Sequence, residues 1–173
     1  ESSPWVSAYV LWTLNEAKKR GTVLPARTIP RGRDYLRGVL ESARQDELYW
    51  PTAAFIVSVL AEIGAPDPGH VARVVDARKQ LPLFARALLL HALVQAKSSP
   101  AVVAELVREL ENNLRVDGNR AFVTENLGDD YAVLLDSPTR TTAMTLRALL
   151  AARPRHPLAA PLARGLLHER RNG

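Results

Sequence analysis

The 173 residues suffice for one domain with one hydrophobic core, and 47% apolar against 24% charged residues is typical of a globular chain. There is no cysteine, which excludes disulfides, cysteine-ligated metals and thiol chemistry within the sequence. The net charge is +5, and residues 1–45 hold eight basic and four acidic side chains. We interpret this basic bias as a solvated helix face and not as a nucleic-acid site, because no aromatic residues are interleaved with the basic ones.

Apolar residues recur at helical spacing along almost the whole sequence. Trp5, Tyr9 and Trp12 form the first stripe, and aromatic residues at this spacing more often belong to a core than to a ligand-stacking face. We predict about eight helices of roughly 10–18 residues joined by short loops. The later stripes begin at Tyr35, Phe55, His70, Leu83, Val102, Leu146 and Leu158.

Three serine–proline pairs predict helix starts. In each pair the serine hydroxyl can cap the first turn, and the proline takes the first helical position, where its missing N–H costs nothing. Gly21 and Gly64 stand where helices are expected to end. The three pairs are Ser3-Pro4, Ser99-Pro100 and Ser137-Pro138.

One stretch departs from the helical spacing. Residues 121–124 and 131–135 have a β-like composition, and turn residues precede them at 117–120 and 127–130. We predict a small β-hairpin inserted between helices near 121–135. It is expected to lie against the helical body, because two strands alone are barely stable.

Taken two by two, the helices recur every 35–45 residues or so, with pairs over 4–44, 51–79, 82–114 and 138–170. This period is typical of antiparallel helix hairpins in an open solenoid or a closed α/α toroid. We predict an all-α chain, a single helical domain over 1–173 that forms part of such a toroid. Because the chain starts at Glu1 and its only methionine is Met144, we expect a fragment of a longer protein that leaves Trp5, Tyr9 and Trp12 uncovered.

Five segments follow one another in a recognisable order. Residues 3–21 match a helix of the type WVTAYALDFLLEAKERG, and residues 29–40, with Asp34-Tyr35-Leu36 at the centre, match RGLDYLR. Residues 53–64 match AYVLAKAG, residues 81–89 match the helix after it, and residues 140–150 match RTTALALRALL. Together they resemble the thioester-containing, complement-like domain of bacterial alpha-2-macroglobulins, and their order over most of the chain carries the resemblance.

The resemblance implies part of an α/α toroid in a large secreted or periplasmic protein that traps proteases. In that family a protease cuts a bait region, and a thioester between Cys and Gln in a Gly-Cys-Xaa-Glu-Gln motif captures the attacker. The implied partners are proteases, through the parent protein, and neighbouring macroglobulin-type domains. This sequence has no cysteine and does not contain the motif, which in the family lies upstream of the first of these helices.

No constellation in the sequence predicts a catalytic, cofactor-binding or metal-binding residue, and no apolar run is long enough to span a bilayer. The four histidines lack the paired spacing of zinc ligands. His91 lies on an apolar stripe and is expected to be a hydrogen-bonded core residue. We therefore predict a non-catalytic helical scaffold. The four histidines are His70, His91, His156 and His168.

Two other classes of function remain open. A catalytic α/α toroid of the terpene-cyclase or glycosidase kind would use the adjacent pair Asp129 and Asp130 as an acidic metal-binding motif. The motif is weak, because the sequence lacks the aspartate-rich helix that such enzymes use. A helical-repeat binding module would offer a basic concave face, and nucleic-acid binding there would depend steeply on salt. That face would be formed partly by Arg27, Arg31, Arg33 and Arg37.

Overall fold

A computed structural model describes residues 3–42, 48–125, 127–134 and 137–169. Within these ranges, eight α-helices, two short 3-10 helices and two strands follow one another. The α-helices are α1 (Pro4–Lys19), α2 (Thr28–Glu41), α3 (Tyr49–Glu62), α4 (Pro68–Asp76), α5 (Leu83–Gln95), α6 (Pro100–Asn112), α7 (Pro138–Ala152) and α8 (Ala159–Glu169). The 3-10 helices are η1 (Arg78–Gln80) and η2 (Asp129–Leu134), and the strands are β1 (Leu114–Asp117) and β2 (Arg120–Val123).

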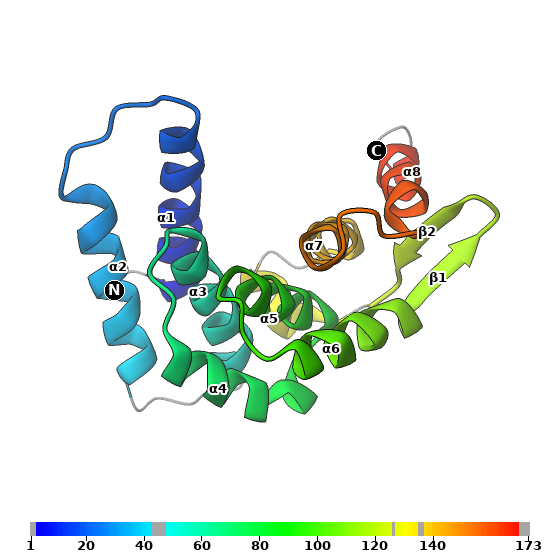
Figure 1. The fold of residues 1–173 in the computed structure, drawn as a ribbon, viewed down its shortest axis with the longest axis horizontal. Helices are drawn as coiled ribbons and strands as arrows, with labels where there is room; N and C mark the ends of the chain where they lie inside the picture. Colours follow the sequence, from blue (N-terminus) through cyan, green and yellow to red (C-terminus); the bar gives the residue numbers. More distant parts are fainter. Residues whose placement is uncertain (1–2, 43–47, 126, 135–136, 170–173) are drawn as a thin grey trace.

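The α-helices pair into the four hairpins that the sequence period predicts, α1–α2, α3–α4, α5–α6 and α7–α8. Helices α1, α3, α5 and α7 pack side by side as an inner row, and α2, α4 and α6 lie outside it (Figure 1). The whole arrangement forms a curved, open arc, with α1 and α2 at one end and α8 at the other (Figure 1). The predicted fold class is confirmed: all-α, built from antiparallel helix hairpins with one small β-hairpin.

The core is centred on α3 and α5, where nearly every side chain is buried. Both helices have neighbours on all sides, because each packs between two other inner helices and against outer helices as well. A helix surrounded in this way needs apolar residues around its whole circumference. The outer helices α4 and α6 instead bury only one stripe each.

The serine–proline pairs begin helices as predicted. The Ser3 and Ser99 hydroxyls each accept from the backbone N–H three residues later at 3.5 Å, and the Ser137 hydroxyl accepts from the Arg140 N–H at 3.1 Å. Asp67 caps α4 in the same way, through the His70 N–H at 3.1 Å. Each cap satisfies one of the amide donors that the first helical turn leaves without an intrahelical partner.

Replacing Ser137 with alanine is expected to lower the free energy of unfolding by about 1 kcal/mol, because the Arg140 N–H then loses its acceptor. The measurement is urea denaturation followed by circular dichroism. Thr139→Ala is the matched control, since it removes an exposed hydroxyl two residues further along the same helix. Equal losses for the two variants would contradict the capping role.

The β-hairpin exists, and its predicted strand at 121–124 matches β2, but the other predicted strand, 131–135, is wrong, because β2 pairs with β1. β1 and β2 pair antiparallel with Leu114 opposite Val123 and Asp117 opposite Arg120, so the turn predicted to precede the hairpin is its connecting turn. Gly118 at φ +58° supplies the left-handed conformation that this turn needs. Most of the predicted second strand, 131–135, belongs to η2, while residue 135 lies outside the described residues.

The expectation of an uncovered aromatic stripe on α1 is also wrong. Trp5 is only 2% exposed, and Tyr9 and Trp12 are half-buried. The other prediction, that the aromatic stripe belongs to the core, is confirmed, because Phe55 of α3 and Phe84 of α5 both pack on Trp5. The apolar residues that α1 does expose, Val6 at 53% and Val10 at 52%, lie one turn apart on another face of the helix.

Candidate functional site

The four inner helices bring side chains together in two layers that are two helical turns apart. The aromatic layer consists of Trp5, Phe55, Phe84 and Arg140. In α3, α5 and α7, the residue seven positions after the member of the aromatic layer belongs to a second layer. Seven residues complete almost two full turns, so the two residues lie on the same face of the helix. With Lys19 at the end of α1, this ionic layer consists of Lys19, Glu62, His91 and Arg147.

The aromatic layer holds a cation among rings. The Trp5 ring lies 4.5 Å from the Phe55 ring and 5.9 Å from the Phe84 ring, centroid to centroid. The Arg140 guanidinium lies over both, 5.4 Å from the Trp5 centroid and 4.9 Å from the Phe84 centroid, and it donates to the Leu134 carbonyl. Cation–π contacts of this kind are strengthened where water is excluded.

The ionic layer is centred on the Glu62 carboxylate, whose side chain is largely buried. It accepts from Lys19 Nζ at 2.9 Å and from the Arg147 guanidinium, so it joins α1, α3 and α7. Arg147 also lies over the Trp12 ring, 5.2 Å from its centroid. On the neighbouring helix α5, His91 Nδ1 lies 3.2 Å from the Ser58 hydroxyl of α3.

Two pKa values follow from this arrangement. Burial alone would raise the pKa of Glu62, but hydrogen bonds from Arg147 and Lys19, with the charge of Arg147, lower it to about 2. Burial lowers the pKa of His91 to about 4, and the positive charge of Arg147 adds to this effect while Glu62 opposes it. At neutral pH Glu62 is therefore charged and His91 is neutral.

Neither group is available for acid–base chemistry with a substrate. Ser58, His91 and Glu62 contain the residue types of a catalytic triad, yet Ser58 is 2% exposed and His91 is 5% exposed. A nucleophile must reach the reacting atom directly. The Glu62 carboxylate already accepts from two cations, so we interpret the ionic layer as a clamp that holds the inner helices together.

The free energy of unfolding is expected to fall by about 1–2 kcal/mol between pH 7 and pH 5 because of His91. The unfolded chain binds a proton at His91 below its ordinary pKa of 6.5, whereas the folded chain does so only near 4. The contribution of His91 to the free energy of unfolding is thus fully present above pH 6.5 and is lost as the pH falls toward 4. Urea titrations at several pH values measure the slope.

His91→Asn is expected to flatten this slope, because the Asn side chain can still reach the Ser58 hydroxyl but does not titrate. His168→Asn is the control, since it makes the same substitution at a side chain that is 47% exposed. A slope that survives in His91→Asn would contradict this assignment. Glu62 contributes in a lower window, between its ordinary pKa of 4.5 and about 2.

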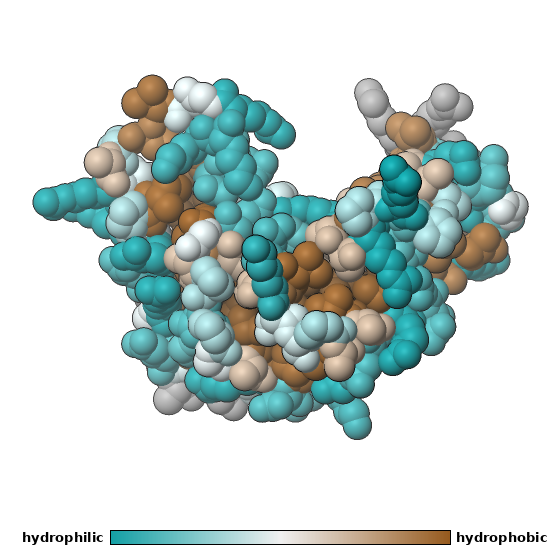
Figure 2. Space-filling model, in the orientation of Figure 1, coloured by the Kyte–Doolittle hydropathy of each residue, from teal (hydrophilic) through white to brown (hydrophobic). Residues whose placement is uncertain are grey.

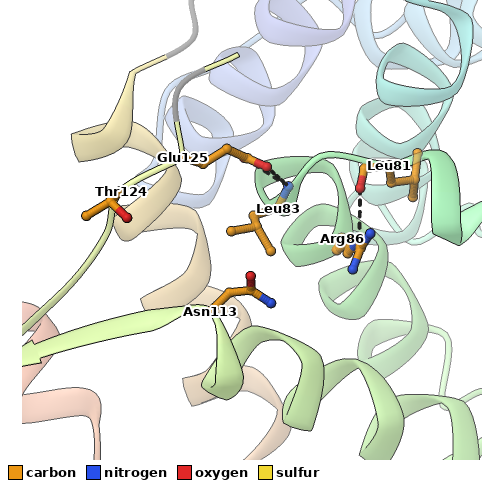
Figure 3. Close-up of a pocket in the computed structure, with 6 residues that line it drawn as sticks. All are labelled: Leu81, Leu83, Arg86, Asn113, Thr124 and Glu125. Carbon is orange, nitrogen blue, oxygen red and sulfur yellow. Dashed lines mark hydrogen bonds between the residues drawn. The ribbon is translucent and has the colours of Figure 1, made fainter.

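A small cavity of about 290 Å³ lies where the start of α5 meets the segment that follows β2 (Figure 3). Its charged side chains, Arg86 and Glu125, are engaged with the protein itself. Both Glu125 carboxylate oxygens lie 2.9 Å from the Leu83 N–H, and Arg86 donates to the Leu81 carbonyl at 2.8 Å and pairs with Glu109 at 3.3 Å. The cavity is smaller than most ligand pockets, and we interpret these contacts as a cap for α5.

A larger groove of about 890 Å³ runs between the start of α1, α2, the start of α3 and the end of η2. Its lining is mainly apolar and includes Trp5, Tyr35, Tyr49 and Leu134. Ser42, Leu48 and Leu134 of this lining adjoin residues outside the described ranges. The groove therefore defines no ligand by itself.

The histidines considered in the sequence analysis do not form one cluster in the described structure. His91 is the buried, hydrogen-bonded residue that its position predicts. His156 is also buried: its Nδ1 accepts from the Leu158 N–H at 3.2 Å, so its Nε2 can donate to Glu111 at 2.8 Å. Among the described residues, no cluster of three or more His, Asp or Glu side chains could hold a metal ion. The side chains of Asp129 and Asp130 lie outside the description.

The predicted basic concave face is wrong. Its four arginines belong to the N-cap and body of α2, which lies on the outside of the arc (Figure 1). Arg33 pairs with Asp34 at 2.7 Å, and Arg37 donates to the Ala65 carbonyl at 3.5 Å. Arg27 and Arg31 remain exposed near the connection from α1. Sequence periodicity could not distinguish an outer from an inner helix here.

The described residues thus form a curved array of antiparallel α-hairpins whose inner helices are joined by an aromatic and an ionic layer. No protein-family model matches the chain, and no curated protein matches it significantly. Solved structures do match, among them bacterial alpha-2-macroglobulins. This agrees with the resemblance seen in the sequence.

Salmonella alpha-2-macroglobulin reacted with methylamine matches all of the chain, with a TM-score of 0.78 and 20% identity, over 11% of its own length. Native Escherichia coli alpha-2-macroglobulin, from domain MG7 to the C-terminus, matches 98% of the chain, with a TM-score of 0.74 and 17% identity, over 26% of its length. The trypsin-activated E. coli protein matches 98%, with a TM-score of 0.73 and 17% identity, over 11%. At these identities the likeness establishes the shared fold, and the chain spans a small part of each protein.

Proposed function

We propose that this chain is a helical scaffold within an alpha-2-macroglobulin-like protease inhibitor, as part of a thioester-type α/α-toroid domain of a longer protein. The observation that carries the proposal is the match of the whole chain to the Salmonella protein. The ordered segments at 3–21, 29–40, 53–64, 81–89 and 140–150 support it independently, because they come from sequence alone. The parent protein is proposed to be periplasmic or extracellular.

In this role the chain contributes shape and no chemistry of its own. The clamp centred on Glu62 and the rings around Arg140 fix the curvature of the inner row, which would position neighbouring macroglobulin-type domains. If the parent captures proteases covalently, the thioester cysteine comes from outside these residues, because they include none. The partners in this proposal are proteases, which the parent protein meets, and the adjoining domains.

Sequencing the gene on both sides of this segment tests the proposal. We expect the same reading frame to continue and to encode macroglobulin-type domains and a bait-like segment. An upstream Gly-Cys-Xaa-Glu-Gln motif would add covalent capture, and its absence would limit the mechanism to non-covalent entrapment. A reading frame that starts within a few residues of Glu1 would refute the scaffold role in a larger inhibitor.

A further inference from the structure

The connection between α1 and α2 carries an unusual concentration of positive charge. Six basic side chains lie between Glu16 and Asp34, and no acidic residue lies among them. Two of the six are engaged, Lys19 with Glu62 and Arg33 with Asp34. The other four are exposed and form no ion pair with the described part of the chain: Lys18, Arg20, Arg27 and Arg31.

An exposed apolar residue stands among these cations. Val23 is 93% exposed, at the middle of the irregular segment between Gly21 and Pro25. The segment is fixed at both ends, because the Thr22 N–H donates to the Ala17 carbonyl and the Thr28 N–H to the Pro25 carbonyl, each at 3.0 Å. We call Lys18, Arg20, Val23, Arg27 and Arg31 the basic tip.

The basic tip lies at an extremity of the molecule. The α1–α2 connection projects beyond the ends of the other helices in Figure 1. The same end of the molecule in Figure 2 shows apolar surface flanked by hydrophilic side chains. An apolar apex surrounded by cations is therefore free to meet a flat surface without obstruction from the rest of the arc.

We propose that the basic tip docks on an anionic phospholipid surface, independently of the function proposed above. The cations would contact lipid phosphates, and Val23 would enter the boundary between headgroups and acyl chains. A protein partner is disfavoured because one short loop falls well below the roughly 1,000 Å² that a stable interface buries. Nucleic acid is disfavoured because the segment has no aromatic residue on which a base could stack.

The docking is peripheral. No helix among the described residues is long and apolar enough to span a bilayer. Each basic residue near an anionic leaflet strengthens binding about fivefold, and the attraction weakens as salt shortens the Debye length. The proposal thus predicts binding that needs anionic lipid, that falls with salt, and that depends on both the cations and the valine.

The experiment measures co-sedimentation of the 173-residue chain with vesicles of phosphatidylglycerol in phosphatidylcholine. We expect binding at low salt, loss at high salt, and none to phosphatidylcholine alone. Arg20→Glu with Arg27→Glu is expected to weaken binding at least about 30-fold. The control pair, Arg108→Glu with Arg115→Glu, changes the net charge equally at exposed positions in α6 and β1. Equal weakening by both pairs would overturn the proposal.

Insertion of the apex is measured separately. Because the chain has no cysteine, Val23→Cys can carry a single environment-sensitive fluorophore. A blue shift is expected on anionic vesicles, whereas a label at Val116→Cys, which replaces a 57% exposed valine in the hairpin, is expected to show none. Equal shifts at both sites, no vesicle binding at low salt, or tighter binding to duplex DNA than to the vesicles would each overturn the proposal.

Discussion

Replacing Trp5 with alanine is expected to lower the free energy of unfolding by about 3–5 kcal/mol. Trp5 is almost fully buried, and the groups packed on it come from the three other inner helices: Phe55 from α3, Phe84 from α5 and Arg140 from α7. Truncation would leave a cavity and remove one of the two rings that face the guanidinium of Arg140. The loss is therefore expected to affect the whole inner row and not α1 alone.

Trp50→Ala is the control for this prediction. Trp50 is half-buried and packs on the Tyr49 ring at 5.0 Å, so its removal is expected to cost clearly less. Trp5→Phe keeps an aromatic ring and is expected to retain much of the stability. Urea denaturation monitored by circular dichroism gives all three values. A smaller loss for Trp5→Ala than for Trp50→Ala would show that the aromatic layer does not join the helices.

Gly165→Ala is expected to destabilise the chain by about 2–3 kcal/mol. A Cβ atom at this position of α8 would lie 2.3 Å from the carbonyl oxygen of Ala121 in β2. Both groups belong to the chain backbone or lie next to it, so no side-chain rotation can relieve the overlap. The helix must move away from the strand, and the contact that joins α8 to the β-hairpin is weakened.

Gly38→Ala is the matched control, because Gly38 also lies inside a helix but has no atom within 4 Å of its ideal Cβ position. This substitution is expected to stabilise the chain by about 0.5–1 kcal/mol, since alanine favours the helix more than glycine does. Hydrogen exchange adds a local measurement: Gly165→Ala is expected to speed amide exchange first in α8 and β2. Uniform acceleration in all helices would contradict the local mechanism.

The helical part of the fold could be predicted from sequence because its determinants are local. The spacing of Trp5, Tyr9 and Trp12, and the serine–proline caps, depend on residues within a few positions of one another. One strand was misplaced because β1 begins at Leu114, only two residues after α6 ends at Asn112, so its apolar residues continue the helical pattern. The turn at Gly118 was recognised, but not as the turn of the hairpin itself.

The two layers could not be predicted, because their members are far apart in the sequence. Glu62 and Arg147 are separated by 85 positions, and each resembles an ordinary solvent-exposed charge when its helix is considered alone. The exposure expected for Trp5 was wrong for the same reason: Phe84 and Arg140, which cover it, come from α5 and α7. One signal was present in the sequence, a repeated spacing of seven residues. It separates Phe55 from Glu62, Phe84 from His91 and Arg140 from Arg147.

Challenge of the complete parent protein with trypsin tests the proposed role most directly. After incubation, residual protease activity is measured on a large protein substrate and on a small chromogenic peptide. Entrapment predicts that cleavage of the large substrate is lost while cleavage of the small peptide persists, because a trapped protease keeps its active site but is screened from bulky substrates. Full activity on both substrates would contradict entrapment, and so would loss of activity on both, which an active-site inhibitor would cause.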